Sequence, residues 1–394
     1  MSAASAGARA PSYRWAVLAA GTAAQASFSG FLIALPVLSP ALRSEYGLSL
    51  TGVGIVLASV WVGTTLTLLP WGLLADRVGE RVVLASGLGI CALALVALAF
   101  VSGFAALVLL VAAAGAAGAS VNAASGRAVM QWFGAEERGF ALGVRQTAIP
   151  VGGVIASLLL PQVEDAAGVR GAFLAMAALC LAGALAGGLL MRGRALDAVE
   201  PDAVPWTVRD RRLWLLSLGS SLYLVAQVAL TGFVVLFLHD ERGLSVSAAA
   251  GVLAAIQVVA AVLRIGAGRW SDALGTRVRP LRWIGLAVFA TLALSAVLEP
   301  APLVLVVPAL VAAGGLSMAW NGLSVTVAAE LAGEHRSGAA IGFQQTALSL
   351  MGTAAPILFA AIVEATNWPI AFALAALGPL AGVFVLGPLA RAGG

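Results

Sequence analysis

Residues 72–81 read Gly-Leu-Leu-Ala-Asp-Arg-Val-Gly-Glu-Arg and separate two long apolar runs, 51–71 and 82–101. A second stretch, 268–277, reads Gly-Arg-Trp-Ser-Asp-Ala-Leu-Gly-Thr-Arg and has both glycines, the aspartate and the last arginine at the same spacing. Each flanking run has about the 20 residues that a helix needs to cross a bilayer. The sequence therefore predicts a membrane protein in which one type of polar turn between spans occurs twice.

The composition agrees with a chain that lies mostly in lipid. Of its 394 residues, 61% are hydrophobic and 10% are charged, and the mean hydropathy is +1.01. A soluble domain carries about 25% charged residues. Membrane-spanning structures are helices or closed barrels, and these runs are too long and too little alternating for barrel strands. We expect an all-α polytopic membrane protein with twelve transmembrane helices, near 15–38, 51–71, 82–101, 104–132, 139–161, 171–191, 213–238, 247–268, 281–298, 302–328, 338–362 and 368–390.

The arginines orient these spans. If the N-terminus lies in the cytoplasm, sixteen arginines fall in cytoplasmic segments, and only Arg43, Arg170 and Arg242 fall outside. Such a bias follows the positive-inside rule of membrane proteins. We expect both termini in the cytoplasm and the chain in the inner membrane of a bacterium, surrounded by lipid.

The two halves of the chain repeat each other at a constant offset. Gly143-Val-Arg-Gln-Thr-Ala-Ile149 is followed 199 residues later by Gly342-Phe-Gln-Gln-Thr-Ala-Leu348, and Asn122 matches Asn321 at the same offset. Parallel repeats of six helices are a known transporter construction, with the substrate bound between them. We expect a first six-helix bundle over 1–191, a cytoplasmic linker over 192–212 and a second six-helix bundle over 213–394.

The two polar turns resemble the signature G-x-L-A-D-R-x-G-R-[RK] of the major facilitator superfamily. The first turn departs from the signature at Glu80, and the second has Ala273 in place of a basic residue. The resemblance covers the whole chain, with twelve spans, a central linker and one motif in the corresponding loop of each half. It implies a transporter, not an enzyme, whose two bundles open alternately to the two sides of the membrane.

By the same resemblance, this motif is conformational machinery that does not bind substrate. Its glycines allow a tight turn and close helix approach, and its charged side chains form contacts that differ between states. Residues 131–143 also resemble the family and offer Glu137 and Arg138 as partners of Arg81 and Asp76. The expected conformational residues are Gly72, Asp76, Arg77, Gly79, Arg81, Glu137, Arg138, Asp272 and Arg277.

Three arginines, Arg127, Arg145 and Arg264, lie inside predicted spans, where burying a charge costs at least about 3 kcal/mol. Arg264 precedes Asp272 by eight residues, and Arg145 follows Arg138 by seven, so both lie at a similar depth of about 12 Å. No acid falls in the middle of a span. We expect the guanidinium groups of Arg145 and Arg264 to approach one anion from opposite halves.

The segment Arg264-Ile-Gly-Ala-Gly-Arg-Trp-Ser-Asp272 also resembles the eighth span of the oxalate–formate antiporter and of monocarboxylate transporters. That resemblance implies an arginine that meets the carboxylate of the substrate. The predicted substrate site consists of Arg264, Arg145, Arg127, Asn122, Asn321, Gln257, Gln344, Gln345 and Tyr223.

Structural roles are alternatives for the three arginines. Arg127 can pair with Glu330, Arg145 can lock the halves by bonding backbone of the span near 247–268, and Arg264 can tie backbone carbonyls together.

The sequence thus predicts a secondary active or facilitative transporter for a small organic anion, with a carboxylate as the bound group, working by alternating access. Since no mid-span acid is present to carry a proton, exchange by an antiporter or facilitated diffusion is favoured over a proton symporter. The alternatives are an exporter of drugs or hydrophobic compounds by proton antiport and a non-transporting membrane sensor. No cofactor, no metal and no nucleic-acid partner is expected, and the chain is expected to act as a monomer.

Overall fold

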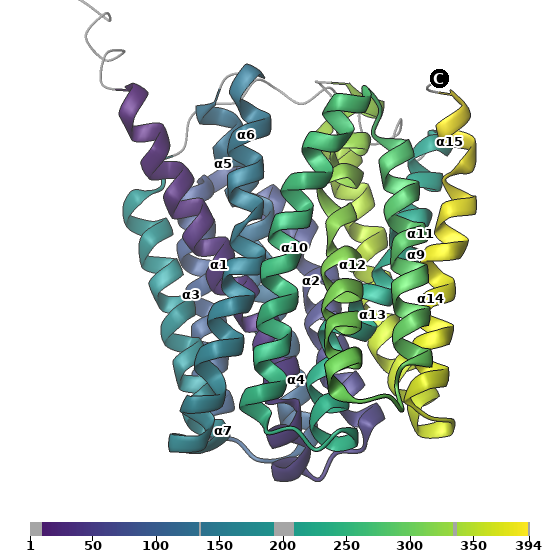
Figure 1. Cartoon of the computed structure of the whole chain (residues 1–394). Coiled ribbons are helices and arrows are strands. Elements are labelled where there is room, and N and C mark those ends of the chain that lie inside the picture. The colour runs from purple at the N-terminus through teal and green to yellow at the C-terminus, as the bar shows by residue number, and fades with distance from the viewer. Residues whose placement is uncertain (1–9, 134, 193–208, 334–336, 393–394) are drawn as a thin grey trace, which may run out of the picture.

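The computed structural model describes residues 10–133, 135–192, 209–333 and 337–392 as helices joined by short turns, with no strand among them (Figure 1). The first part, which we call the N-half, contains α1 (Ala10–Tyr46), α2 (Leu50–Val78), α3 (Glu80–Leu98), α4 (Phe104–Gly118), α5 (Ser120–Trp132), α6 (Ala135–Gln146) and α7 (Ala148–Leu190). The second, the C-half, contains α9 (Arg211–Leu236), the short π-helix η2 (Phe237–Glu241), α10 (Val246–Leu274), α11 (Val278–Val297), α12 (Leu303–Ala332), α13 (Ser337–Ala365), α14 (Trp368–Val385) and α15 (Gly387–Ala392).

Eleven helices of the described chain are long and apolar enough to cross a membrane, and α7 accounts for the difference from the predicted twelve. This helix has 43 residues, about 65 Å at 1.5 Å per residue, which is roughly twice the thickness of the hydrocarbon core. Gly168 interrupts it with φ 65° and ψ −174°, a backbone conformation open to glycine. Residues 148–167 and 169–190 are therefore two spans, and the protein is all-α and polytopic as predicted.

Several predicted boundaries differ from the structure; α2 and α10, for example, continue to Val78 and Leu274, past the predicted ends at 71 and 268. The first helix continues past Leu38 to Tyr46, with Pro36 and Pro40 inside it. Prolines are tolerated in membrane helices because neighbouring groups satisfy the carbonyls that they leave open. The run predicted over 104–132 is two helices, α4 and α5, which meet at Ala119.

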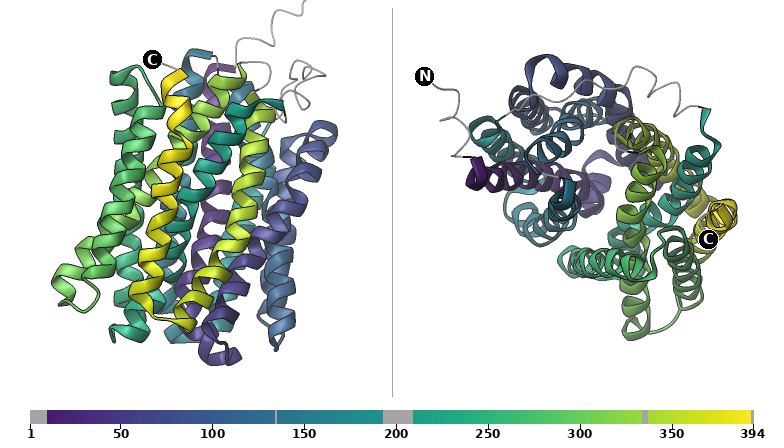
Figure 2. Two further views of the ribbon diagram at one scale, coloured as in Figure 1. Left: turned by 90° about the vertical axis from the view of Figure 1, so that its right-hand side faces the viewer. Right: turned by 90° about the horizontal axis from the view of Figure 1, so that it is seen from above.

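The two halves lie side by side when the molecule is viewed from above (Figure 2). The start of α1 and the end of α15 lie at the same end of the bundle, as an even number of spans requires. We call this end the linker side and the opposite end, which carries Tyr46 and Ala365, the far side. Across the boundary α2 packs on α13, α7 packs on α10, and α1 contacts α9.

Glycines allow this close packing within and between the halves. A Cβ on Gly152 would lie 2.2 Å from the carbonyl oxygen of Ala26, and one on Gly352 would lie 2.4 Å from the Trp61 ring. Small residues of this kind drive helix association in lipid, where apolar burial does not. Gly152 thus allows α7 to approach α1 closely, and Gly352 allows α13 to approach α2 across the boundary.

Candidate functional site

Arg264 is partly exposed on α10, where this helix packs against α7 of the other half. Its Nη1 lies 3.3 Å from the carbonyl oxygen of Gln146 in the N-half, and its Nη2 lies 3.3 Å from the carbonyl oxygen of Met318 on α12. Its Nε is buried and has no partner in the described part of the chain. The guanidinium therefore bridges the two halves through neutral acceptors.

Asn321, one of the predicted site residues, extends this arrangement within the C-half. Its Nδ2 donates to the same Met318 carbonyl and to Oε1 of Gln227 on α9, both at 3.0 Å. A chain of polar groups thus connects α9, α12 and α10 with the boundary between the halves. None of the ion pairs between described residues involves Arg264, so no carboxylate of the described chain neutralises this charge.

By residue count Arg145 lies at a depth in the membrane similar to that of Arg264, but its side chain points into the N-half. Its side chain is 7% exposed, its Nη2 donates to Oε1 of Gln25 on α1 at 2.7 Å, and its Nε donates to Oγ of Ser125 on α5 at 2.8 Å. In this conformation the structure brings Arg264 to the backbone next to Arg145, at Gln146, and holds the Arg145 guanidinium among α1, α5 and α6.

A matching cluster without charge occupies the C-half. Gln344 stands 199 residues after Arg145, and Ser324 stands 199 residues after Ser125. The Nε2 of Gln344 donates to Oγ of Ser324 at 2.5 Å, and Ser324 is hydrogen-bonded to Ser220 on α9. Gln344, predicted to bind substrate, is thus buried among its own helices, with its Oε1 unpartnered in the described chain.

The remaining predicted site residues are scattered. Tyr223 is 1% exposed, donates its hydroxyl to the Leu281 carbonyl at 3.2 Å and packs on Trp320, inside the C-half. Gln257 is fully buried against Gly153 on α7 at the boundary, and neither of its amide atoms has a partner in the described chain. Asn122 is exposed and Gln345 partly exposed. The side chain of Arg127 lies outside the described part of the structure.

Two of the four motif glycines form turns as predicted, whereas Gly72 and Gly268 lie inside α2 and α10. Gly79 ends α2 with φ 84°, and Gly275 ends α10 with φ 63°, both in the region that side chains disfavour. Close helix approach at Gly72 and Gly268 is not found in this conformation, since a Cβ at either position would meet no atom within 4 Å. Gly79 and Gly275 therefore shape the turns, whereas Gly72 and Gly268 face open space in this conformation.

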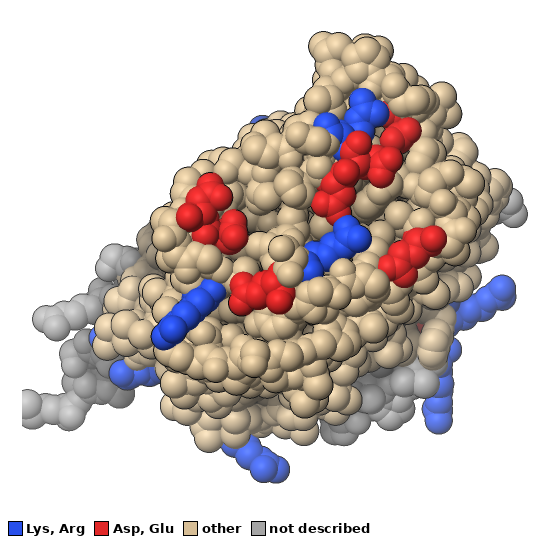
Figure 3. Space-filling view, turned by 90° about the horizontal axis from the view of Figure 1, so that it is seen from below, with Lys and Arg blue, Asp and Glu red and all other residues tan. Residues whose placement is uncertain are grey.

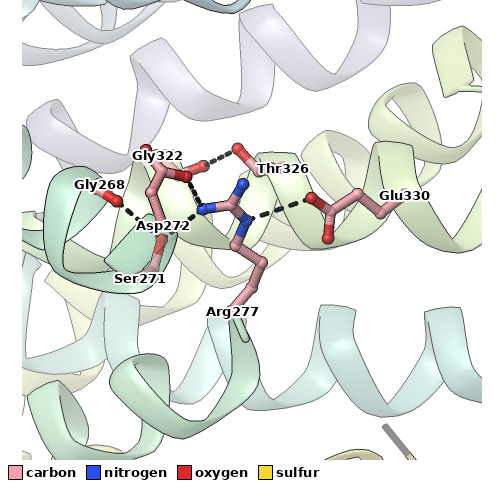
Figure 4. Close-up of polar contacts among 7 residues, drawn as sticks. All are labelled: Gly268, Ser271, Asp272, Arg277, Gly322, Thr326 and Glu330. Atoms are coloured by element: carbon pink, nitrogen blue, oxygen red, sulfur yellow. Dashed lines mark hydrogen bonds and ion pairs between the residues drawn. The ribbon is translucent and has the colours of Figure 1, made fainter. Parts of the chain in front are cut away.

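In the C-half, the motif arginine Arg277 stands at the N-cap of α11 and bonds residues of α10 and α12 (Figure 4). Arg277 donates Nη1 to the Asp272 carboxylate and to Oγ of Ser271 at 2.6 Å, and Nε to Oε1 of Glu330 at 3.1 Å. The hydrogen bond that Arg277 donates to Asp272, with the one that it donates to Glu330, raises the pKa of Arg277 above its ordinary value. Glu330 thus pairs with Arg277, and the alternative pairing of Glu330 with Arg127 falls on a side chain outside the described structure.

In the N-half, Arg81 and Glu137 contact other partners than each other. Glu137 pairs with Arg14 on α1 at 2.5 Å, whereas Arg81 donates Nε to the carbonyl of Gly188. Glu80, the residue that departs from the signature, is 2% exposed and accepts a bond from Gln131 on α5. The backbone of Asp76 and Arg138 is helical and Arg77 is exposed, but the side chains of Asp76 and Arg138 lie outside the described structure.

Two polar ties join the halves on the far side, where acidic and basic side chains lie next to one another (Figure 3). Arg43 at the end of α1 forms an ion pair with Asp240 of η2. The carboxylate of Glu364 on α13 accepts bonds from the N–H of Thr51 at 2.9 Å and from its hydroxyl at 2.5 Å. The Arg264–Gln146 bond also joins the two halves. In this conformation the first two polar contacts hold the two halves together on the far side.

Several of these residues escaped the sequence analysis. Ser125, Ser220 and Ser324 were not singled out, because single serines are common in membrane helices. The signal that could have found Ser125 and Ser324 is their 199-residue offset, the same as that of Arg145 and Gln344.

Comparison with known proteins agrees with this architecture. A family model described as Major Facilitator Superfamily matches residues 18–356. An uncharacterised MFS-type transporter of Mycobacterium tuberculosis is 34% identical over 376 residues, covering 94% of this chain and 84% of the relative. A probable sulfoacetate transporter of Cupriavidus necator is 26% identical over 388 residues, covering 89% of each chain.

A solved structure shares the fold. The crystal structure of a bacterial homologue of the human lysosomal transporter Spinster, in an inward-facing and occupied conformation, superimposes with a TM-score of 0.77. It is 18% identical and covers 95% of this chain and 94% of that chain. The fold, the repeated polar turns and the relatives lead to one assignment: this chain is an integral membrane transporter that belongs to the major facilitator superfamily.

Proposed function

We propose that this transporter moves a small organic anion by alternating access, and that Arg264 binds a carboxylate of the substrate. The two bundles, residues 1–191 and 213–394, rock about the boundary where Arg264 lies. Both termini and the 192–212 linker face the cytoplasm of a bacterial cell, in agreement with the distribution of the arginines.

The observation that carries the proposal is the environment of the Arg264 guanidinium. It lies at the boundary of the halves, is partly exposed, and is held by two backbone carbonyls at 3.3 Å. Hydrogen bonds from a guanidinium to a carboxylate are shorter, about 2.7–2.9 Å, and roughly twice as strong as bonds between neutral groups. An entering carboxylate thus offers this cation better acceptors than those it has.

Further features support an anionic substrate. Arg145 adds a second positive charge inside the N-half, also without an acid among the described ion-pair partners. Asn321 and Gln227 lie next to the Arg264 network, where amides can bind the polar part of a small substrate. Sulfoacetate, named for the Cupriavidus relative, is a small organic anion with a carboxylate.

A binding screen with matched neutral compounds tests this proposal. The melting temperature of the purified protein is measured with sulfoacetate, glycolate, lactate, oxalate, nitrate and cyanate, and with the neutral amides glycolamide and lactamide. A ligand that binds only the folded state raises the melting temperature. We expect at least one carboxylate to do so while its amide does not. Stabilisation by neutral hydrophobic compounds alone would contradict the proposal and favour an exporter.

A further inference from the structure

Pro150 leaves one backbone carbonyl at the boundary between the halves without its usual donor within the helix. It is buried in the first turn of α7, and a proline has no N–H to donate to the carbonyl four residues earlier. That carbonyl belongs to Gln146, the last residue of α6. The next N–H, of Val151, donates to Thr147 at 3.1 Å as in a regular helix. The Gln146 carbonyl therefore needs a donor from outside its helix.

Arg264 of the other half supplies that donor. Its Nη1 lies 3.3 Å from the Gln146 oxygen, slightly longer than the usual 2.7–3.2 Å of an N–H to O bond. The bond is therefore a weak one, and a stronger acceptor can displace it. If it breaks without replacement, both the carbonyl and the guanidinium lose a partner in a largely apolar region, which is unfavourable.

We infer that the Arg264–Gln146 bond is a latch between the halves that the substrate anion releases, with Pro150 as the residue that keeps the carbonyl open. The inference rests on the proposed function, since the anion competes for the same guanidinium. In the empty transporter the bond ties α10 to the junction of α6 and α7 and slows the change of state. With an anion bound, the guanidinium stays satisfied while the halves separate at this point. The loaded transporter therefore changes state faster than the empty one, which favours exchange over net flux.

Pro150→Ala tests the latch without any ligand. Alanine restores an N–H that can donate to Gln146 within the helix, so the carbonyl no longer needs Arg264. Spin labels at Ser44→Cys on α1 and Ser247→Cys on α10, both exposed on the far side, report whether that side is closed. The buried cysteines Cys91 and Cys180 are replaced by alanine in this background.

The ligand-free parent protein should show one short distance, and Pro150→Ala should raise the open fraction roughly tenfold, the effect of one lost polar contact. The matched control is Pro161→Ala in the same helix, whose freed carbonyl at Ser157 accepts no hydrogen bond from the described part of the C-half. It should leave the distances unchanged. An unchanged distribution in Pro150→Ala would overturn the latch.

A double-mutant cycle separates the latch from a general change in helix stiffness. Arg264→Gln, whose amide nitrogen ends two bonds short of the Nη1 that contacts Gln146, should also raise the open fraction. Adding Pro150→Ala to it should then have no further effect. Additive effects would mean that Pro150 acts independently of Arg264, and the inference would be wrong.

Sulfoacetate is then added to the parent protein and to Pro150→Ala. Release of the latch predicts that the anion shifts the distances of the parent toward those of Pro150→Ala and shifts Pro150→Ala little. If sulfoacetate and the other anions of the screen shift neither protein, while the ligand-free cycle behaves as expected, the proposed anion substrate fails and the bond is a latch without an anionic release. If the anions bind but Pro150→Ala matches the parent, only the latch fails.

Discussion

The guanidinium of Arg264 divides its donors between a carbonyl of its own half and one of the other half. This geometry combines the two roles that the sequence set against each other, an anion ligand and a tie between backbone carbonyls. They are compatible because the carbonyls are neutral and the bonds are long, so an anion can replace one of them.

Substituting Arg264 should therefore lower affinity more than stability. A hydrogen bond to a charged group contributes about 1.5–3 kcal/mol, so Arg264→Gln should weaken anion binding roughly tenfold to a hundredfold. Arg264→Lys should recover part, because an ammonium cannot make the paired planar contact. Affinity and ligand-free melting temperature are measured on the same purified variants.

Arg282→Gln is the matched control, since Arg282 also donates to a backbone carbonyl, that of Val383, but within the C-half. It should leave affinity unchanged. Loss of ligand-free stability in Arg264→Gln with unaltered affinity would show a structural role alone.

Arg145 should tolerate an amide better than an apolar residue. In the C-half, Gln344 bonds Ser324 at the position that Arg145 and Ser125 occupy in the N-half. Arg145→Gln can keep a bond to Ser125, whereas Arg145→Leu leaves the buried oxygen atoms of Ser125 and Gln25 short of a donor, at a cost of about 1–3 kcal/mol. The melting temperature should fall further in Arg145→Leu. Equal losses would mean that the positive charge itself stabilises the fold.

Residue numbers alone predicted the depth of the site but not the direction of its side chains. Counting from Asp272 and Arg138 placed Arg264 and Arg145 at similar levels, and the Arg264–Gln146 bond confirms that these levels meet. Neighbouring residues on a helix point in directions about 100° apart, so depth does not say which neighbour faces the boundary. The direction of Arg145 depends on Gln25 of α1 and Ser125 of α5, which accept its hydrogen bonds.

At the scale of whole elements, the far side is closed by a contact that spans both halves. The Glu364 carboxylate of α13 accepts from the N–H of Thr51 in the first turn of α2. A negative charge at a helix N-terminus is favourable, because the first N–H groups have no acceptor within their helix. α13 therefore caps α2 while this side is shut.

Glu364→Gln should loosen this closure. The amide keeps one acceptor but loses the charge. The open fraction of the far side should therefore rise several-fold, the effect expected for weakening one charge-assisted hydrogen bond. A cysteine in place of Leu57, which is buried on α2 close to Gly232 of α9, reports opening through its reaction with a membrane-impermeant thiol reagent. Glu45→Gln, an exposed acid at the same end, is the control. Equal reaction rates in both variants would exclude the cap as a gate element.

Element boundaries were predictable where polar turns interrupt apolar runs and not where helices continue through polar or bent positions. The turns at Gly79 and Gly275 could be predicted from the sequence, because glycine readily adopts the positive φ that both turns have. The extension of α1 through Pro40 does not, since it depends on packing against neighbouring helices. The break between α4 and α5 at Ala119 also carries no proline or glycine at that position.

At the scale of the molecule, the arginine distribution predicts the orientation. Ser44→Cys on the far side should react with an impermeant thiol reagent added to intact cells, and a cysteine at Arg192 on the linker side should react after the membrane is opened. Reaction of the Arg192 cysteine in intact cells would reverse the orientation and with it the cytoplasmic linker.

The architecture of the molecule was more predictable than its site. Lipid as solvent limits the chain to helices, and the 199-residue repeat and the two polar turns indicate the family. The site depends on contacts between residues far apart in sequence, such as Gln227 with Asn321 and Arg264 with Gln146, whose pairing no local pattern encodes.

Counterflow in proteoliposomes tests the central claim most directly. Vesicles with the purified protein are loaded with an unlabelled anion, sulfoacetate first and then the other anions of the screen, and radiolabelled anion is added outside. The account predicts transient accumulation of label with the parent protein and with Arg282→Gln, and a loss of roughly tenfold or more with Arg264→Gln. Accumulation that is equal in the parent and in Arg264→Gln, or that occurs only with neutral compounds, would contradict an anion transporter built around Arg264.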